Sequence, residues 1–310
     1  MPKKIAIPKN LEPAGKQLLK EHGFTIVELP DQKTSTLLKL APDAFGVILY
    51  SAPFPNDTIE HMPDLKILAR YGVGYDNLDV PYLNKHGIFV TITPLANAST
   101  VAETTMASIL ALSKHLVPAT NEMRAGHWTE ARSHVGFDLA GKTLGIIGYG
   151  RIGKMVEKKM SALDMRILVS SPHATKAEYG TVVDRDTLLQ EADVVTLHMP
   201  VLPATKHSIA AREFNLMKDS AVLVNFSRGA IINTPDLITA LQTGSISGAA
   251  LDVFDEEPLP LNSPLYQLDN VLMTPHIAAN TVECNDRMAT DAAKEIIRVA
   301  AGEQPQWPVH

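Results

Sequence analysis

Residues 143–163, TLGIIGYGRIGKMVEKKMSAL, carry the strongest structural signal in this chain of 310 residues. A β-rich run leads into the glycine pattern GYGRIG (148–153), and an amphipathic helical pattern follows it. Gly148 permits a tight turn, Gly150 lets the backbone approach a pyrophosphate, and Gly153 permits close packing of helix on strand. The N-terminus of the helix offers free N–H groups to phosphates. The stretch therefore predicts a dinucleotide-binding βα unit.

Short β-type runs alternate with helical patterns in two series along the chain. In residues 1–97 the sequence predicts strands at 3–8, 24–29, 44–50, 65–71 and 87–93, with helices at 10–22, 33–40, 56–62 and 79–86. The second series predicts strands at 142–148, 165–171, 193–199, 220–227, 246–253 and 270–276. Such alternation is typical of parallel sheets covered by helices on both faces, so the predicted fold class is α/β.

The segment between the two series has a different pattern. Residues 97–116 predict one long helix, with Ser99 or Thr100 as its N-cap. Residues 117–142 show no clear periodicity, and we expect an irregular, extended arm there.

Composition limits the function classes. The formal net charge is -6 without a basic block, which argues against a nucleic-acid partner. Cys284 is the single cysteine, so neither an internal disulfide nor a thiolate metal site is expected. The sequence contains neither a signal-peptide core of roughly 7–15 apolar residues nor the roughly 18–20 apolar residues of a membrane span. We expect a cytoplasmic protein that binds neither membrane nor metal.

The end of the second predicted strand of the nucleotide unit bears on the choice of cofactor. NAD-binding proteins of this type usually have a carboxylate there, which accepts hydrogen bonds from the ribose hydroxyls. This chain has Ser171, followed by His173 and Lys176. A carboxylate would repel a 2′-phosphate, whereas these side chains would accept one. The sequence therefore favours NADP, with NAD as the alternative.

Three reactive side chains follow late strands of the second series: Arg228, Glu257 and His276. The ends of parallel strands meet at one edge of a sheet, where ligands bind. A guanidinium can hold a carboxylate through two parallel hydrogen bonds, and an imidazole can exchange a proton near neutral pH. A carboxylate beside that imidazole orients it and raises its pKa. Together with a dinucleotide turn, these residues predict hydride transfer at a 2-hydroxy or 2-keto acid.

With these motifs in place, the chain resembles a known family, the D-isomer-specific 2-hydroxyacid dehydrogenases. The resemblance runs through nearly the whole chain, and the motifs stand in the family's order. They are RYGVGYDNLDV (70–80), ASTVAETT (98–105), LGIIGYGRIG (144–153), LHMPVLPATKH (197–207), VNFSRGAIIN (224–233), ALDVFDEEP (250–258) and TPHIAANT (274–281).

The resemblance implies roles for particular residues. Arg228 would bind the substrate carboxylate, Glu257 would pair with His276, and His276 would be the acid/base. The backbone of Val73 and Gly74 would help to hold the substrate. The residues implied to line the cofactor are Thr105, Arg151, Ile152, His198, Pro200 and Asp252.

The resemblance also implies an architecture of two Rossmann-like domains, one flavodoxin-like and one dinucleotide-binding, with the active site in the cleft between them. Residues 1–97 with 285–310 would form the substrate-binding domain, so the last helix would pack back on the first series. Residues 98–284 would form the nucleotide-binding domain. A homodimer would be joined through the helix and arm of residues 98–145.

Three departures from the family pattern stand out. Ser171 replaces the usual Asp of NAD-dependent members. Tyr50, in LYSAPFP, stands where phosphoglycerate dehydrogenases have a phosphate-binding Arg, so a substrate with a small uncharged tail is favoured. Asp164 replaces a glycine common before the second strand, and the sequence suggests no function for it.

The predicted activity is reduction of glyoxylate, hydroxypyruvate or a similar small 2-keto acid. Two alternatives remain open. One is a 3-phosphoglycerate dehydrogenase, disfavoured by Tyr50. The other is a nucleotide-sensing corepressor, a binding protein that resembles this family.

Overall fold

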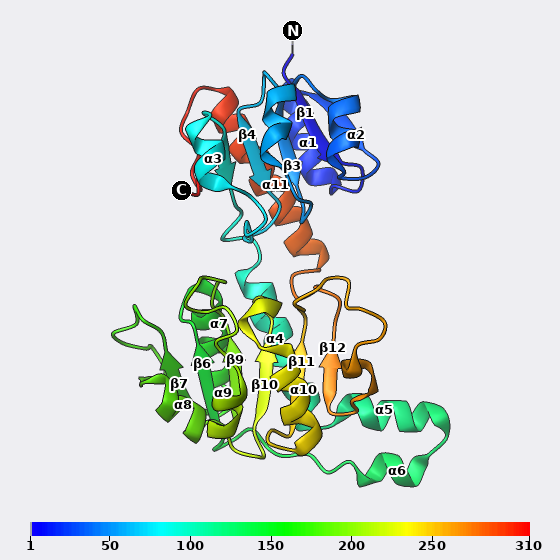
Figure 1. The fold of residues 1–310 in the computed structure, drawn as a ribbon, viewed down its shortest axis with the longest axis vertical. Coiled ribbons are helices and arrows are strands. Elements are labelled where there is room, and N and C mark those ends of the chain that lie inside the picture. Colours follow the sequence, from blue (N-terminus) through cyan, green and yellow to red (C-terminus); the bar gives the residue numbers. More distant parts are fainter. Residues whose placement is uncertain (1) are drawn as a thin grey trace. The chain divides into compact units, whose positions relative to one another are not determined.

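The computed structural model describes residues 2–310, which form two compact units (Figure 1). The first unit holds the chain up to Asn97 together with Asn280–His310, and the second holds Ala98–Ala279. Each unit contains one β-sheet in which all neighbouring strands are parallel. The predicted α/β class with two parallel sheets is confirmed.

The chain returns to the first unit at an earlier residue than the sequence predicted. The sequence placed this crossing near Asn285, but helix α11 (Val282–Ala300) begins earlier. Thr281 caps this helix, because its hydroxyl accepts a 3.2 Å hydrogen bond from the Cys284 N–H. This cap places the start of the helix before Asn285.

The first unit has the strand order β2-β1-β3-β4-β5, which is the flavodoxin-like order. Its strands are β1 (Lys4–Pro8), β2 (Thr25–Leu29), β3 (Ala44–Leu49), β4 (Ile67–Arg70) and β5 (Phe89–Thr91). Its helices are α1 (Pro13–Glu21), α2 (Thr34–Leu40), α3 (Val80–Lys85) and α11, with a 3₁₀ segment, η1 (Asn56–His61). The strands predicted for this region are all confirmed.

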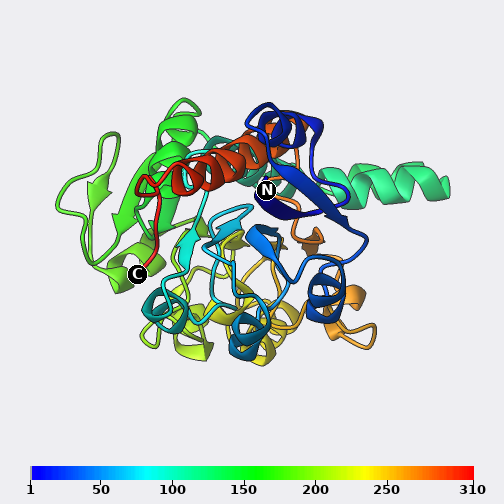
Figure 2. The same ribbon diagram turned by 90° about the horizontal axis from the view of Figure 1, so that it is seen from above.

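Helix α11 packs on the first unit, as predicted. It lies against α1, which Figure 2 shows from above, and its residue Ile296 is buried in one cluster with Ile5 and Ile67. A Cβ at Gly15 would lie 2.8 Å from the Ala289 Cβ. Glycine at this position in α1 therefore allows the two helices to cross closely.

The second unit has the strand order β12-β11-β10-β9-β6-β7-β8. Its strands are β6 (Thr143–Ile147), β7 (Arg166–Ser170), β8 (Thr181–Val182), β9 (Val194–Leu197), β10 (Val222–Asn225), β11 (Gly248–Leu251) and β12 (Val271–Met273). Its helices are α4 (Ala98–Ser113), α5 (Leu116–Ala125), α6 (Trp128–Ser133), α7 (Arg151–Ser161), α8 (Arg185–Glu191), α9 (Ala211–Leu216) and α10 (Thr234–Thr243), with 3₁₀ segments η2 (Gly229–Ile231) and η3 (Pro264–Gln267). All the strands predicted here are confirmed, and β8 is an additional short edge strand.

The strand order reverses between β6 and β9, so a topological switch point lies at their carboxyl ends. The central strands are buried on both faces. In β10, for example, Leu223 belongs to one hydrophobic cluster, while Val222 and Val224 belong to another. This burial explains why the strands appear in the sequence as continuous apolar runs. The apolar core fixes the strands, and the site residues extend from their ends.

Two predictions for residues 98–142 are wrong. Helix α4 begins at Ala98, so Ser99 and Thr100 lie within its first turn and do not cap it. The arm is largely helical and includes α5 and α6, whereas the sequence predicted irregular structure (Figure 1). Left-handed residues bound α5, with φ of +48° at His115 and +82° at Gly126. Within residues 2–310, no helix combines the length and apolar character needed to cross a membrane.

Candidate active site

The glycine turn is shaped by contacts with neighbouring backbone. Gly148 follows β6 with φ of +93°, and a Cβ there would lie 2.4 Å from the His198 carbonyl oxygen. A Cβ at Gly153 would lie 2.4 Å from the Gly148 carbonyl oxygen. A side chain at either position would therefore collide with backbone, so both positions require glycine. At Gly150 a Cβ would meet no described atom within 4 Å, so space is open beside the N-terminus of α7.

His198 lies after β9, directly beside this turn. Its Nε2 is 3.0 Å from the Thr196 Oγ1, and its backbone N–H donates to the Ile147 carbonyl at 2.8 Å. Burial lowers the pKa of His198 to about 3, so the imidazole is neutral at physiological pH. Its buried Nδ1 has no hydrogen-bond partner within the described chain. A neutral ring with one unsatisfied nitrogen is suited to a polar ligand at the switch point.

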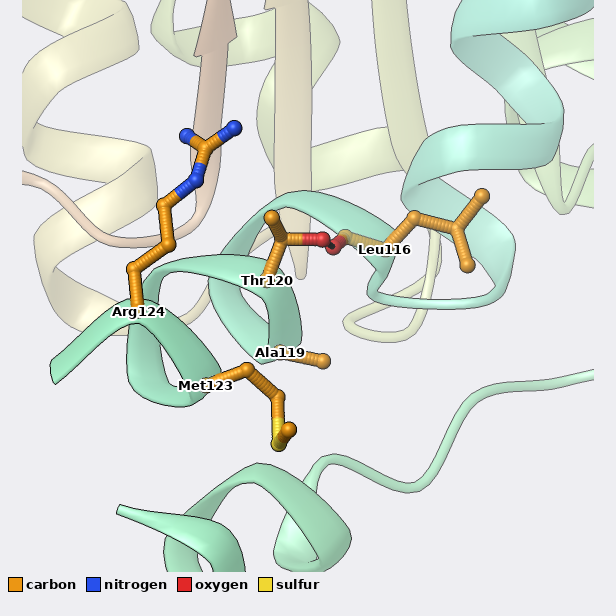
Figure 3. A pocket seen from close by; sticks show the side chains of 5 residues that line it. All are labelled: Leu116, Ala119, Thr120, Met123 and Arg124. Carbon is orange, nitrogen blue, oxygen red and sulfur yellow. Dashed lines mark hydrogen bonds between the residues drawn. The ribbon is translucent and has the colours of Figure 1, made fainter. Parts of the chain in front are cut away.

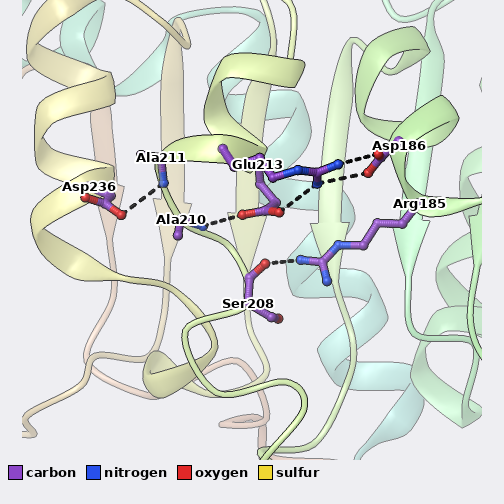
Figure 4. Close-up of polar contacts among 8 residues, drawn as sticks. Arg185, Asp186, Ser208, Ala210, Ala211, Glu213 and Asp236 are labelled. Carbon is purple, nitrogen blue, oxygen red and sulfur yellow. Dashed lines mark hydrogen bonds and ion pairs between the residues drawn. The ribbon is translucent and has the colours of Figure 1, made fainter.

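The loop after His198 is held at its other end by contacts with α8 and α9 (Figure 4). Arg185, the first residue of α8, donates to the Ser208 carbonyl. The Glu213 carboxylate accepts a 3.1 Å hydrogen bond from the Ala210 N–H. These contacts fix the far end of the segment that carries exposed Pro200.

Arg228 is positioned by the buried side chain of Asn225 at the end of β10. The Asn225 amide donates to the Arg228 carbonyl at 2.8 Å, and its oxygen accepts from the Ser227 N–H and hydroxyl at 3.1 and 2.8 Å. The next residue, Gly229, lies so close to the loop after β11 that a Cβ would be 1.9 Å from the Phe254 carbonyl carbon. Glycine is therefore required for the Arg228 loop to pack against the loop that carries Glu257.

Asp252, at the end of β11, organises the His276 loop. Its buried carboxylate accepts hydrogen bonds from the Thr274 hydroxyl at 2.6 Å, the Ile277 N–H at 2.7 Å and the Ala278 N–H at 2.8 Å. Its carbonyl accepts the His276 N–H at 2.8 Å. His276 has a left-handed φ of +54°, which is uncommon for a residue with a side chain. These hydrogen bonds hold the strained backbone and present the imidazole.

Glu257 and His276 form a pair. The Glu257 Oε2 lies 2.8 Å from the His276 Nδ1, and Oε1 accepts the Phe254 N–H at 3.0 Å. The hydrogen bond to Glu257 raises the pKa of His276, against the opposing effect of burial. Burial favours protonation of Glu257, but hydrogen bonds from His276 and Phe254 and the charge of Arg228 outweigh it and lower the pKa of that carboxyl. The His276 Nε2 remains available for a reacting group.

Known proteins resemble the chain over most of its length. A family model described as D-isomer specific 2-hydroxyacid dehydrogenase, NAD binding domain, matches residues 106–278. A glyoxylate reductase of Thermofilum pendens is 36% identical over 97% of this chain and 93% of its own length. A D-3-phosphoglycerate dehydrogenase of Methanocaldococcus jannaschii is 38% identical over 97% of this chain and 58% of its own length. The chain belongs to the D-isomer specific 2-hydroxyacid dehydrogenase family.

Solved structures agree with this family. An NADPH-dependent glyoxylate/hydroxypyruvate reductase of Sinorhizobium meliloti, crystallised with NADP and malonate, is 26% identical, with a TM-score of 0.89 over 100% of this chain and 97% of that one. As a D-2-hydroxyacid dehydrogenase, the protein transfers a hydride between a nicotinamide dinucleotide and a 2-keto or 2-hydroxy acid.

The residues at the switch point fit a dinucleotide. The backbone at Gly150 is open, the N-cap of α7 is this glycine and so has no capping side chain, and within residues 2–310 the His198 Nδ1 has no hydrogen-bond partner. Exposed Arg151 and half-buried Ile152 form the first turn of α7 and would lie along the pyrophosphate. Thr105 is fully buried, and its hydroxyl donates to the Val101 carbonyl at 2.8 Å. Like Asp252, Thr105 was expected to line the cofactor, and that contact stays a prediction.

In the first unit, the predicted substrate residues lie at strand ends of the flavodoxin-like sheet. Tyr50 follows β3, and its ring centroid is 4.6 Å from that of Tyr71. Val73 and Gly74 follow β4, where Arg70 Nε donates to the Gly74 carbonyl at 2.8 Å. These contacts fix the loop on the dehydrogenase's first unit.

Sequence reasoning missed two residues of the site region, Asn225 and Glu12. Asn225 is a polar residue that ends a buried apolar strand three positions before Arg228, and this was an available signal. Glu12 follows β1 and gave no signal in the sequence. Burial, with the Glu12 charge as a further cause, raises the pKa of both Tyr50 and Tyr71. The Glu12 Oε2 is buried and has no hydrogen-bond partner within the described residues.

Proposed function

We propose that this protein reduces glyoxylate, hydroxypyruvate or a similarly small 2-keto acid to the D-2-hydroxy acid, with NADPH as the favoured cofactor. The observation that carries the proposal is the 2.8 Å pair of Glu257 and His276, with Arg228 on the adjoining loop. The resemblance to glyoxylate reductases along nearly the entire chain supports the substrate class.

Each residue of this set has a defined part in the proposed reaction. Arg228 holds the substrate carboxylate through paired hydrogen bonds and fixes the plane of the keto acid. When bound, a reduced nicotinamide supplies the hydride that adds to the α-carbon. His276 donates a proton from Nε2 to the carbonyl oxygen, which becomes the product hydroxyl. Glu257 keeps His276 protonated and orients its ring.

Residues of the first unit favour a substrate with a small uncharged tail. In the flavodoxin-like strand order, ligands bind at the switch point between β1 and β3, which are followed by Glu12 and Tyr50. The Glu12 carboxylate would repel a phosphate on the substrate. Burying that phosphate without a cationic partner would cost several kcal/mol. We propose that Tyr50, with the backbone of Val73 and Gly74, contacts the substrate. Equal kcat/KM values for hydroxypyruvate and its 3-phosphate would contradict this and favour the phosphoglycerate dehydrogenase alternative.

The choice of NADP rests on the loop after β7. Half-buried Ser171 follows this strand, and His173 and Lys176 are exposed. This segment contains no carboxylate before Glu178 and offers hydroxyl, imidazole and ammonium groups to a 2′-phosphate. The NADPH-dependent reductase of similar fold also supports the choice. Comparing kcat/KM for NADPH and NADH tests it.

We propose a homodimer joined through the α4–α6 region. Helix α5 has no buried residue, and a shallow groove along it is lined by Leu116, Ala119, Thr120, Met123 and Arg124 (Figure 3). Leu116, Met123 and Trp128 are large apolar side chains that stay exposed in the single chain. A second copy of the same arm would cover this surface. Light scattering at micromolar concentration should give the mass of a dimer.

A panel of 2-keto acids with NADPH, followed at the nicotinamide absorbance, tests the function as a whole. Turnover of glyoxylate or hydroxypyruvate is the expected result. Dinucleotide binding without turnover of any member would favour the corepressor-type alternative.

For location, the single cysteine supports a reducing compartment, and we propose the cytoplasm.

A further inference from the structure

A buried carboxylate stands behind the dinucleotide turn, outside the set of residues that the proposed function uses. Glu157 lies on α7 and is only 1% exposed. Its Oε2 accepts a hydrogen bond from the hydroxyl of Tyr149, the residue between the first two glycines of the turn. Its Oε1 accepts the backbone N–H of Tyr179 at 2.8 Å. Both oxygens of this buried group are therefore used.

The Tyr149 hydroxyl extends the connection. It also accepts the backbone N–H of Glu178 at 3.2 Å. Burial and the hydrogen bond to Glu157 raise the pKa of Tyr149 to about 12, so its hydroxyl keeps the proton that it donates. Two successive N–H groups of one loop thus bind to a side chain of the glycine turn and to a side chain of α7.

That loop, residues 171–180, connects β7 to β8 and begins with the proposed 2′-phosphate contacts. At its far end, a Cβ at Gly180 would lie 2.7 Å from the Ile167 carbonyl, so the chain passes close to β7 there. The loop is therefore held at both ends by β7 and at residues 178 and 179 by the pair of Tyr149 and Glu157. Lys154, also on α7, has its Nζ 5.5 Å from the Tyr149 ring centroid and adds a cation to this surface.

We propose that Tyr149 and Glu157 are positioning residues that hold the 171–180 loop in register with the glycine turn and thereby determine the selection of NADP over NAD. The selectivity part rests on the proposed function. Donors on a loop already held in place lose less conformational entropy on binding than donors on a free loop. The 2′-phosphate of NADPH draws on Ser171, His173 and Lys176, whereas NADH offers this loop only its uncharged ribose hydroxyls. NADH relies on the turn and the helix N-terminus, so it should depend less on the loop.

Two variants test the proposal, Tyr149→Phe and Glu157→Gln. The first removes the hydroxyl, and the second leaves one carbonyl oxygen where two carboxylate oxygens accept. Calorimetry should show NADPH binding about tenfold more weakly in each variant, with NADH within threefold of wild type. The same contrast is expected between adenosine 2′,5′-bisphosphate and 5′-AMP. In the keto-acid assay KM for NADPH should rise about tenfold while kcat stays within twofold.

Tyr179→Phe is the matched control. It removes a hydroxyl from the same loop but keeps the backbone N–H that binds Glu157, and its side chain is exposed. We expect its Kd for NADPH to stay within twofold of wild type. Thermal unfolding of each variant checks that the fold is retained. A ratio of NADPH to NADH affinity that is unchanged in both test variants, or an equal loss for both cofactors, would overturn the selectivity claim.

Amide hydrogen exchange tests whether Tyr149 and Glu157 position the loop. Its result does not depend on which cofactor the protein prefers. The Glu178 amide, which donates to the Tyr149 hydroxyl, should be protected in the wild type without cofactor and exchange at least tenfold faster in Tyr149→Phe. Unchanged protection would overturn the positioning role, whichever cofactor is preferred. If instead wild type binds NADH as tightly as NADPH, the proposed cofactor is wrong. Faster exchange of the Glu178 amide, with weaker binding of both dinucleotides in the variants, would then support positioning alone.

Discussion

The charge of Glu257 should set the upper pH limit of keto-acid reduction. Glu257→Gln keeps an oxygen that can accept the His276 Nδ1–H, so the ring orientation is retained while the negative charge is lost. Reduction needs His276 protonated, and activity therefore falls as pH rises through its pKa. Since Glu257 raises that pKa, the variant should lose activity at lower pH than wild type.

The size of this shift follows from the geometry of the pair. A charge-assisted hydrogen bond contributes about 1.5–3 kcal/mol when well shielded, and an exposed ion pair about 0.2–1 kcal/mol. Here the side chains of Glu257 and His276 are 37% and 52% exposed, so the lower part of the combined range applies. About 1.4 kcal/mol corresponds to one pKa unit. The basic limb of kcat should thus move down by roughly half a unit to one unit.

The assay is a pH series of kcat at saturating keto acid and cofactor. Glu256→Gln is the matched control, because it removes the same charge from the adjacent, exposed residue and should leave the profile unmoved. A basic limb that stays in place in Glu257→Gln, or that moves equally in the control, would refute the coupling of Glu257 to His276.

Three other substitutions probe the site. His276→Ala should lower kcat by about 100- to 10,000-fold, the usual contribution of a positioned acid/base, with cofactor Kd unchanged by calorimetry. Ser171→Asp should move the ratio of kcat/KM values toward NADH by about 1–3 kcal/mol; a wild type that already prefers NADH tenfold would contradict the basis of this prediction. Asn225→Ala leaves buried groups of the Arg228 loop unpaired and should destabilise the fold by about 1–3 kcal/mol in urea unfolding, while KM for the keto acid rises more than kcat falls. An unchanged KM would show that Asn225 does not position Arg228.

The strands and the glycine turn could be predicted because their signals are local. A buried parallel strand is a short apolar run, and the requirement for Gly148 and Gly153 follows from the turn itself. The two helices of the arm were missed for a related reason. Helix α5 has no buried residue. Its sequence therefore lacks the apolar stripe by which a helix that faces an internal core is recognised.

The supporting roles of Glu12 and Glu157 could not be predicted, because their partners lie far away in sequence. Glu12 acts on Tyr50 and Tyr71, and Glu157 meets the backbone of Tyr179. No spacing rule links such positions. The cofactor contact of Asp252 stays a prediction, and the hydrogen bonds from its buried carboxylate to the loop that carries His276 had no signal in the sequence. Sequence patterns identified the reactive groups more readily than the residues that hold them.

The hydrogen bonding of the sheet joins the loops that carry Arg228 and His276, the proposed carboxylate-binding residue and the proposed acid/base. Asn225 holds the Arg228 loop, and Asp252 holds the His276 loop, at the ends of adjacent strands β10 and β11. The Asp252 N–H donates to the Asn225 carbonyl at 3.1 Å, so the two supports are themselves joined. Hydride transfer demands that the substrate carboxylate and carbonyl oxygen be fixed together, since small misplacements of reacting groups slow a reaction strongly. Joining both supports through one backbone hydrogen bond meets that demand with rigid elements.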